Sequence, residues 1–229
     1  MRRAFGFREG CVLANTTLIV KEIEKLKQKL LLLGGKVEEN FNKAVKAVDE
    51  RDVGMAEDVI NADDLIDQME VEIEEECLKI LALHQPVARD LRFIVTALKV
   101  NNDLERIDDH SVSIARHALF FANQPIFKFP FDYMAMSSMT RKMLKLSLDS
   151  LVQLDQAKAI SVGAMDDAVD DMNRSMYDAS EKGMKANPDQ ISMYVHAMGM
   201  SRTFERIADL STNIAEDVIY LISGQIVRH

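Results

Sequence analysis

The sequence predicts an all-α protein of two tandem three-helix bundles, with six long helices that arise from an internal duplication. The main observation is a repeat, since ERIDDHSVSIARHA at 105–118 returns as ERIADLSTNIAEDV at 205–218. A second pair lies upstream in the same order, because DDLIDQM at 63–69 is matched by DDAVDDM at 166–172. The members of each pair lie about 100 residues apart, so the duplicated unit is of that length.

Composition supports the same fold class and restricts the function. Tryptophan is absent, and the 229 residues include only nine glycines and four prolines, which is typical of helical proteins. The formal net charge of −9 argues against a nucleic-acid-binding surface, which normally needs a basic face. Two cysteines, Cys11 and Cys77, form neither a CxxC motif nor a disulfide framework, so we expect a reducing compartment.

The start of the chain does not predict a membrane or export signal. No apolar stretch reaches the length of a membrane span. The apolar segment at 11–20 is interrupted by three polar residues, and no A-x-A cleavage site follows it. We expect a cytoplasmic protein with an N-terminal extension at 1–18, a first repeat at 19–124 and a second repeat at 125–229.

Three helices are predicted in the first copy. Apolar residues recur at helical spacing over 18–48, with a weak point at the glycine pair 34–35. The second helix is expected over 52–84, because the residue before Pro86 avoids helical geometry. The third helix is expected from 87 to about 121, since a proline just before a helix fits its first turn.

The second copy repeats this scheme. Helices are predicted over 133–154 and 158–185, and Pro188 separates the second of these from a last helix over 189–222. Gly224 is expected to cap that last helix. Because the connections are short, consecutive helices run antiparallel, and each copy forms a three-helix bundle.

Acidic side chains four residues apart lie beside the core-facing side of four helices. In the third helix the series at 104, 107, 111, 114 and 118 faces the core, which leaves an acidic pair on the flank. Like charges at this spacing repel by about 0.2–0.5 kcal/mol per pair, so a bound cation would stabilise them. The four pairs are Glu105 with Asp109, Glu205 with Asp209, Asp63 with Asp67, and Asp166 with Asp170.

Two interpretations of these pairs are open from the spacing alone. If neighbouring helices lie side by side, the carboxylates of one repeat converge on a hard cation or a small cluster. Oxygen ligands favour magnesium, calcium, manganese or iron over a structural zinc. In the other interpretation the carboxylates are solvated flank residues that are partly neutralised by Arg106 and Arg206.

Three segments together resemble the PhoU family: QPVARDLRF at 85–93, LERIDDH at 104–110, and ERIAD followed by NIAED within 205–217. The resemblance extends from about residue 20 to the C-terminus and implies two tandem three-helix bundles. It also implies a cytoplasmic accessory protein of a high-affinity phosphate ABC transporter that negatively regulates the phosphate-starvation response. The implied partners are the transporter ATPase subunit and a sensor histidine kinase, and the protein, a homodimer, reaches the membrane only through them.

The resemblance adds to the metal hypothesis. The E/D-x-x-x-D motifs of the family bind iron or zinc clusters in some members, which implies metal binding at the eight acidic residues named above. Manganese or magnesium also suits oxygen ligands. Two departures predict unequal sites, because Leu210 stands where a histidine is common and Ser113 stands where an asparagine is common.

Arg89 and Arg92 belong to the QPVARDLRF segment, which has no counterpart in the second copy. We expect these two side chains to contact an acidic surface of a partner or a phosphate group. The alternative is that they pair within the chain with Asp90 and nearby acids.

Two classes of function are compatible with these features. A regulatory adaptor works through protein contacts and needs no catalytic group. A metal enzyme or iron-storage bundle of the carboxylate type normally supplies Glu-x-x-His pairs inside its core, and no such motif occurs. The sequence favours the non-enzymatic adaptor, serving a phosphate transporter or, as an alternative, a different transporter.

Overall fold

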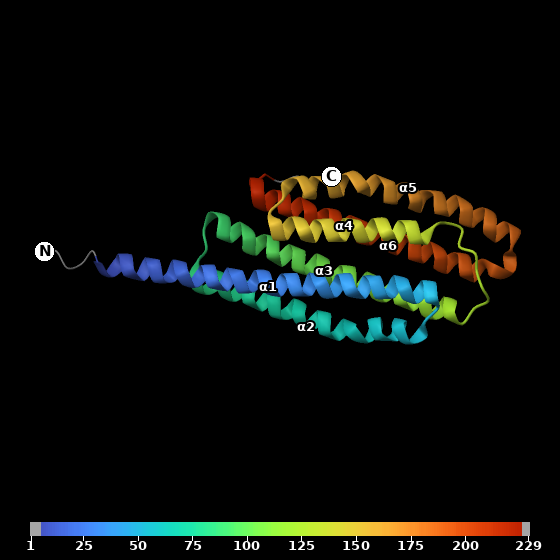
Figure 1. Ribbon diagram of the computed structural model, residues 1–229, viewed down its shortest axis with the longest axis horizontal. Helices are drawn as coiled ribbons and strands as arrows, with labels where there is room; N and C mark the ends of the chain where they lie inside the picture. The colour runs from blue at the N-terminus through green and yellow to red at the C-terminus, as the bar shows by residue number, and fades with distance from the viewer. Residues whose placement is uncertain (1–5, 226–229) are drawn as a thin grey trace.

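The structure, a computed structural model, describes residues 6–225 and the side chains of residues 18–225. The described chain consists of six α-helices and one short 3₁₀ helix without strands, which confirms the predicted all-α fold. Figure 1 shows α1–α3 as one antiparallel bundle and α4–α6 as a second bundle beside it. The elements are α1 (Gly6–Glu50), α2 (Val53–His84), α3 (Ala88–Ala122), α4 (Tyr133–Gln153), α5 (Gln156–Ala186), η1 (Pro188–Gln190) and α6 (Ile191–Ser223).

The first helix is longer than predicted. It begins at Gly6 rather than at about residue 18, so the described part of the 1–18 extension is helical. The first five residues of that extension lie outside the described range. Apolar spacing did not reveal this start because most apolar residues of 6–17 form one run at 11–14, which polar residues follow at 15–17. No proline interrupts the segment.

Aspartate caps set the starts of three helices. Asp52, Asp132 and Asp155 each accept a hydrogen bond from the backbone amide three residues later, at 2.9 to 3.1 Å. The last of these caps places the start of α5 at Gln156, slightly ahead of the prediction. The intervening 3₁₀ helix delays the start of α6 to Ile191.

Helix α1 contacts the second bundle through several side chains. It runs without a break through the glycine pair, and a Cβ atom at Gly34 would lie 2.9 Å from Leu148 Cδ2 of α4. This glycine is therefore a point of close helix–helix approach rather than a weak point. Further along α1, Phe41 meets Phe204 of α6 edge to face with ring centroids 6.1 Å apart, and both side chains are fully buried.

Helices α3 and α6 pack against each other in opposite directions and join the two bundles. Near the start of α3, Lys99 Nζ lies 2.6 Å from Asp217 Oδ1. Near its end, the His117 ring lies against Gly199. Residues 99 and 199 are equivalent in the repeat, as are 117 and 217, so these contacts are related by an approximate two-fold axis. The buried side chains of both repeats form one continuous core around this axis.

A pair of neutral histidines closes one end of the α3–α6 interface. His117 Nδ1 and His196 Nδ1 are 3.0 Å apart, so the protonated nitrogen of one ring donates a hydrogen bond to the unprotonated nitrogen of the other. The His196 ring stacks on Phe120 with centroids 3.5 Å apart. Burial and the neighbouring His196 lower the pKa of His117 to about 4, and burial also lowers the pKa of His196.

A buried polar pair distinguishes the first repeat from the second. Asn40 Nδ2 donates to Asp108 Oδ1 at 3.0 Å, and the second Asp108 oxygen is buried without a hydrogen-bond partner. Burial raises the pKa of Asp108 to about 7. In the second repeat the equivalent positions are the buried apolar residues Met143 and Ala208. At these two positions the duplicated cores therefore differ by the exchange of a polar pair for an apolar pair.

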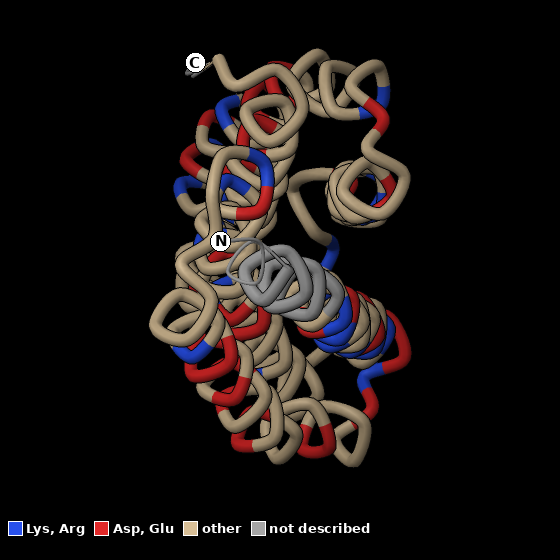
Figure 2. The backbone as a smooth tube through the Cα atoms, turned by 90° about the vertical axis from the view of Figure 1, so that its left-hand side faces the viewer, with Lys and Arg blue, Asp and Glu red and all other residues tan. Residues whose placement is uncertain are grey.

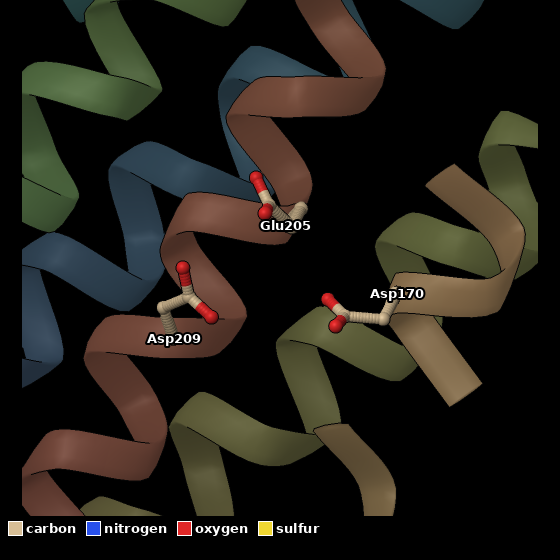
Figure 3. Close-up of side chains that lie close together, drawn as sticks. All are labelled: Asp170, Glu205 and Asp209. Atoms are coloured by element: carbon tan, nitrogen blue, oxygen red, sulfur yellow. The ribbon is translucent and has the colours of Figure 1, made fainter. Parts of the chain in front are cut away.

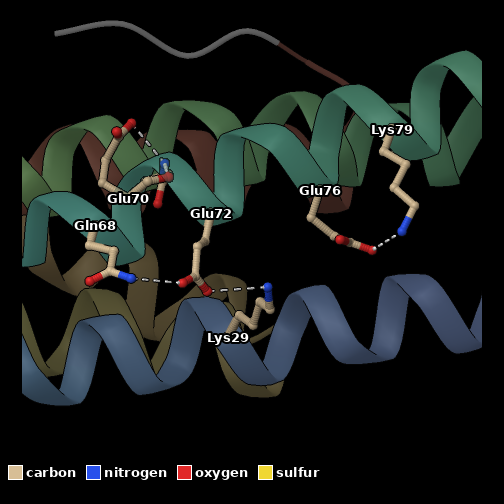
Figure 4. Close-up of polar contacts among 7 residues, drawn as sticks. Lys29, Gln68, Glu70, Glu72, Glu76 and Lys79 are labelled. Carbon is tan, nitrogen blue, oxygen red and sulfur yellow. Dashed lines mark hydrogen bonds and ion pairs between the residues drawn. The ribbon is translucent and has the colours of Figure 1, made fainter. Parts of the chain in front are cut away.

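The outer surface carries many charges. Figure 2 looks along the helices from the end where α1 begins, and acidic residues are spread over both repeats. On α2, Glu72 pairs with Lys29 of α1 at 3.6 Å, and Glu70 accepts a hydrogen bond from Asn101 at 2.9 Å (Figure 4). The exposed Glu72–Lys29 pair contributes little to stability. None of the helices within residues 6–225 is long and apolar enough to cross a membrane.

Replacing the polar pair by its counterparts from the second repeat tests the account of Asn40 and Asp108. Asn40→Met alone is expected to lower the free energy of unfolding by about 1–3 kcal/mol, because it leaves a buried carboxylate without its donor. The double variant Asn40→Met/Asp108→Ala is expected to recover most of that loss. Urea denaturation at pH 8 measures both, and a double variant at least as unstable as Asn40→Met would contradict the account.

Acid sensitivity tests the account of the histidine pair. The folded-state pKa of His117 lies below its ordinary value of 6.5, so the unfolded chain binds more protons between pH 6.5 and about 4. The contribution of His117 to the free energy of unfolding should fall as the pH falls through this interval, whereas buried carboxyls with a raised pKa, such as Asp108, contribute in the opposite sense. His117→Gln should therefore gain stability relative to the wild type between pH 7 and pH 5. Urea denaturation at the two pH values measures the difference, with His84→Gln as the control. An equal change with pH in wild type and His117→Gln would refute the explanation.

Candidate metal centre

The eight predicted acidic residues form two separate clusters, one in each repeat. Because α2 packs on α3, Asp63 and Asp67 lie near the acidic pair of α3. Burial, then Asp109 and Asp67, raise the pKa of Glu105. Packing of α5 on α6 brings the other four together in the same way. The structure therefore brings the carboxylates of each repeat near one another.

The tightest arrangement is in the second repeat. Asp170 of α5 and Glu205 and Asp209 of α6 each place one carboxylate oxygen within 4.8 Å of the other two (Figure 3). Within residues 18–225 this is the one such trio of Asp, Glu, His or Cys side chains. Hard cations bind carboxylate oxygens at about 2.0–2.6 Å, so three oxygens at this spacing fit around a single ion.

Electrostatic repulsion within this trio favours a cation. Burial and the nearby Asp170 raise the pKa of Glu205. Burial, then Glu205 and Asp166, raise the pKa of Asp209 to about 6. Arg206 opposes both shifts, but within the described chain no ion pair links it to either carboxylate. The arginines thus neutralise the cluster only in part, and a bound cation would neutralise it further.

The acidic cluster of the first repeat is looser than that of the second, and a buried aspartate lies beside it. Burial, followed by Asp67 and Asp109, raises the pKa of Asp63, but these carboxylates do not converge as tightly as those of the second repeat. The buried Asp108 lies near the same group, as its electrostatic coupling to Asp63 shows. Asp108 was not among the acidic residues predicted from the sequence. Its position four residues after Leu104 and three before Ser111 is a core-facing position and was the available signal.

The two clusters approach each other across the two-fold axis. A hollow of about 430 Å³ between α3 and α6 is lined by Asp109 and Asp209, one from each cluster. His110 also lines the hollow. Its equivalent in the second repeat, Leu210, lines the hollow as well, but its side chain is only 3% exposed. The two repeats thus present different side chains to the same hollow, which is consistent with unequal sites.

Arg89 and Arg92 lie away from both clusters. They occupy the first turns of α3 and line a separate cleft at the end of the molecule. No ion pair joins either of them to Asp90 in the part of the chain that the structure describes. The expected alternative, in which Arg89 and Arg92 form ion pairs with Asp90, is therefore not observed.

Comparison with known proteins places this arrangement in a family. The family model of the PhoU domain matches residues 30–118 and again residues 133–218, which are the two helical bundles. The chain belongs to the PhoU family. Both copies of the acidic E-R-I-x-D segment fall within the matched residues.

Relatives extend over nearly the whole chain. The chain is 38% identical over 211 residues to the "Phosphate-specific transport system accessory protein PhoU homolog" of Pseudomonas aeruginosa, covering 91% of this chain and 86% of the relative. The protein of the same description from Aquifex aeolicus is 36% identical over 211 residues, covering 92% and 96%. These matches confirm the resemblance on which the sequence interpretation drew.

Solved structures confirm the fold. The crystal structure of PhoU from Pseudomonas aeruginosa superposes with a TM-score of 0.85 at 38% identity, covering 90% of this chain and 99% of that one. The phosphate transport system regulatory protein PhoU from Streptococcus pneumoniae gives a TM-score of 0.82 at 31% identity, covering 92% and 100%. The arrangement of the two bundles is therefore shared with these proteins.

Neutralising one carboxylate of the trio should separate stability from cation binding. At pH 8, with a chelator present to remove divalent cations, Asp209→Asn is expected to have a free energy of unfolding about several tenths of a kcal/mol higher than the wild type, because the substitution removes like-charge repulsion. With excess Mn²⁺ the wild type should gain thermal stability and the variant should gain less. The equivalent Asp109→Asn is the matched control. Equal Mn²⁺ shifts for wild type and Asp209→Asn would exclude a cation at this trio.

Proposed function

We propose that this protein is a non-enzymatic regulatory adaptor of a phosphate ABC transporter and a negative regulator of the phosphate-starvation response. The observation that carries the proposal is membership of the PhoU family over both repeats. Curated relatives at 36–38% identity are described as accessory proteins of a phosphate-specific transport system, and the match extends over most of each chain.

The proposed partners are the transporter ATPase subunit and a sensor histidine kinase. We place the adaptor in the cytoplasm as a homodimer that reaches the membrane only through these partners. When phosphate is abundant, the adaptor binds the ATPase subunit and holds the kinase in the state that favours dephosphorylation of its target. A rigid helical scaffold suits this role, because one continuous core fixes the relative positions of surfaces contributed by both repeats.

We further propose a cation at Asp170, Glu205 and Asp209. The convergence of their oxygens within 4.8 Å supports this site, and oxygen ligands suit iron, manganese or magnesium, with zinc as a further option. The cation would link α5 to α6 and neutralise the acidic trio, so its role would be to stabilise or modulate the adaptor. The second candidate function, metal storage in a helical bundle, rests on the same trio.

Deletion of the gene tests the adaptor proposal. Secreted phosphatase activity in phosphate-rich medium should rise on deletion and return to its basal level when the wild-type gene is restored. Restoration with Glu205→Gln/Asp209→Asn then reports whether the acidic trio is needed for repression. An unchanged phosphatase level on deletion would contradict the proposal and favour an accessory role for a different transporter. A loss of cellular iron or manganese content instead would favour metal storage.

A further inference from the structure

A cleft of about 870 Å³ is lined by residues of four helices. It is formed where α1 and the start of α3 meet the last turns of α4 and α6, so both repeats contribute to it. Its apolar lining is unusually accessible, since Val20 is 58% and Val152 is 52% exposed. Leu31 and Leu154 add further exposed apolar surface. Accessible apolar surface gathered in a concave site is typical of an interaction site.

Basic side chains stand around this apolar lining. Lys27, Arg89 and Arg92 are opposed by Glu24 and Asp90, which leaves a local excess of one positive charge in a chain of net charge −9. The Arg92 Nε atom is buried without a hydrogen-bond partner. Neither arginine forms an ion pair among the described residues. The exposed Arg89 guanidinium is therefore available to carboxylates from outside the chain.

The corner between α2 and α3 immediately precedes Arg89 and Asp90 of the cleft in the chain. Gln85 and Ala88 adopt positive φ angles of 47° and 46°, which are uncommon for residues other than glycine. Between them Val87 is 74% exposed, and Leu83 and Leu91 on either side are 65% and 40% exposed. A strained corner that displays apolar side chains beside two arginines is a feature expected of a contact site rather than of packing.

We propose that this cleft docks an amphipathic helix of a partner protein, with apolar side chains against the lining and carboxylates toward Arg89 and Arg92. The charge and the mixed apolar and basic lining together select this occupant. A lipid surface is disfavoured because the site is concave and the chain as a whole repels anionic headgroups. The inference deepens the proposed adaptor function, on which it rests for the identity of the partner.

Two kinds of probe test the proposal. One kind is the purified transporter ATPase subunit and the purified cytoplasmic region of the sensor kinase encoded in the same genome. The other is a fluorescein-labelled synthetic peptide of about 18 residues with leucines at helical spacing and glutamates on the flanks, compared with the same peptide carrying lysines instead. The peptide probe does not depend on the adaptor proposal, so the two proposals can fail separately.

The variants carry matched controls. Arg89→Glu/Arg92→Glu should weaken binding at least about tenfold, and the affinity of the wild type should fall with added salt. Arg141→Glu/Lys142→Glu makes the same charge change at exposed positions on α4 and should leave binding unchanged. Val152→Ser should weaken binding, whereas Ile160→Ser, at a side chain 58% exposed on α5, should not. Far-ultraviolet circular dichroism confirms that each variant is folded.

The outcomes separate the hypotheses. If a protein probe binds the wild type and both cleft variants weaken that binding, the result supports both the docking proposal and the adaptor proposal. Binding of the glutamate peptide alone supports the cleft and contradicts the adaptor. Protein binding that neither cleft variant changes overturns the cleft and leaves the adaptor standing. If no probe binds, the cleft is overturned. If the arginine variant instead alters the oligomeric state by sedimentation equilibrium, the occupant is a second copy of this chain and the proposal fails.

Discussion

The antiparallel packing of α3 against α6 is the contact on which the rest of the molecule depends. It relates the two repeats by an approximate two-fold axis, so contacts such as Lys99 with Asp217 recur at equivalent positions. Small buried residues allow the two helices to approach. Ser111 and Ser211 each donate a hydrogen bond to the carbonyl four residues earlier, at 3.0 and 2.7 Å, so their hydroxyls are buried with a partner. One core then serves both bundles.

This packing also determines where the acidic clusters lie. The buried side of α3 or α6 is mostly apolar, and the flanking acidic pair lies near the acidic pair of α2 or α5. Each cluster is therefore held between two helices of one repeat, close to the axis but on opposite sides of it. The proposed cation would relieve the repulsion among Asp170, Glu205 and Asp209, whose oxygens lie close together. A stability deficit at a preformed oxygen site is a common property of binding sites.

Much of this arrangement follows from the sequence. Helical spacing predicts the six helices, and the pairs four residues apart predict which carboxylates share the flank of one helix, because both are local properties. The start of α1 at Gly6 was missed because its first residues lack apolar spacing. Features that depend on tertiary packing were also missed. The His117–His196 pair joins side chains distant in sequence, and the burial of Asp108 depends on Asn40 of another helix. The cleft at Arg89 requires four helix ends to meet, which no local pattern specifies.

The central claim, that α3 and α6 make the two repeats one folding unit, is tested most directly by scanning calorimetry of the wild type and Phe204→Ala. Phe204 is fully buried against Phe41 of the other repeat. The account predicts a single transition in both proteins, with equal calorimetric and van't Hoff enthalpies, displaced to lower temperature in the variant by a loss of about 3–5 kcal/mol. Two resolved transitions in the wild type, or a variant in which only one repeat melts earlier, would contradict it.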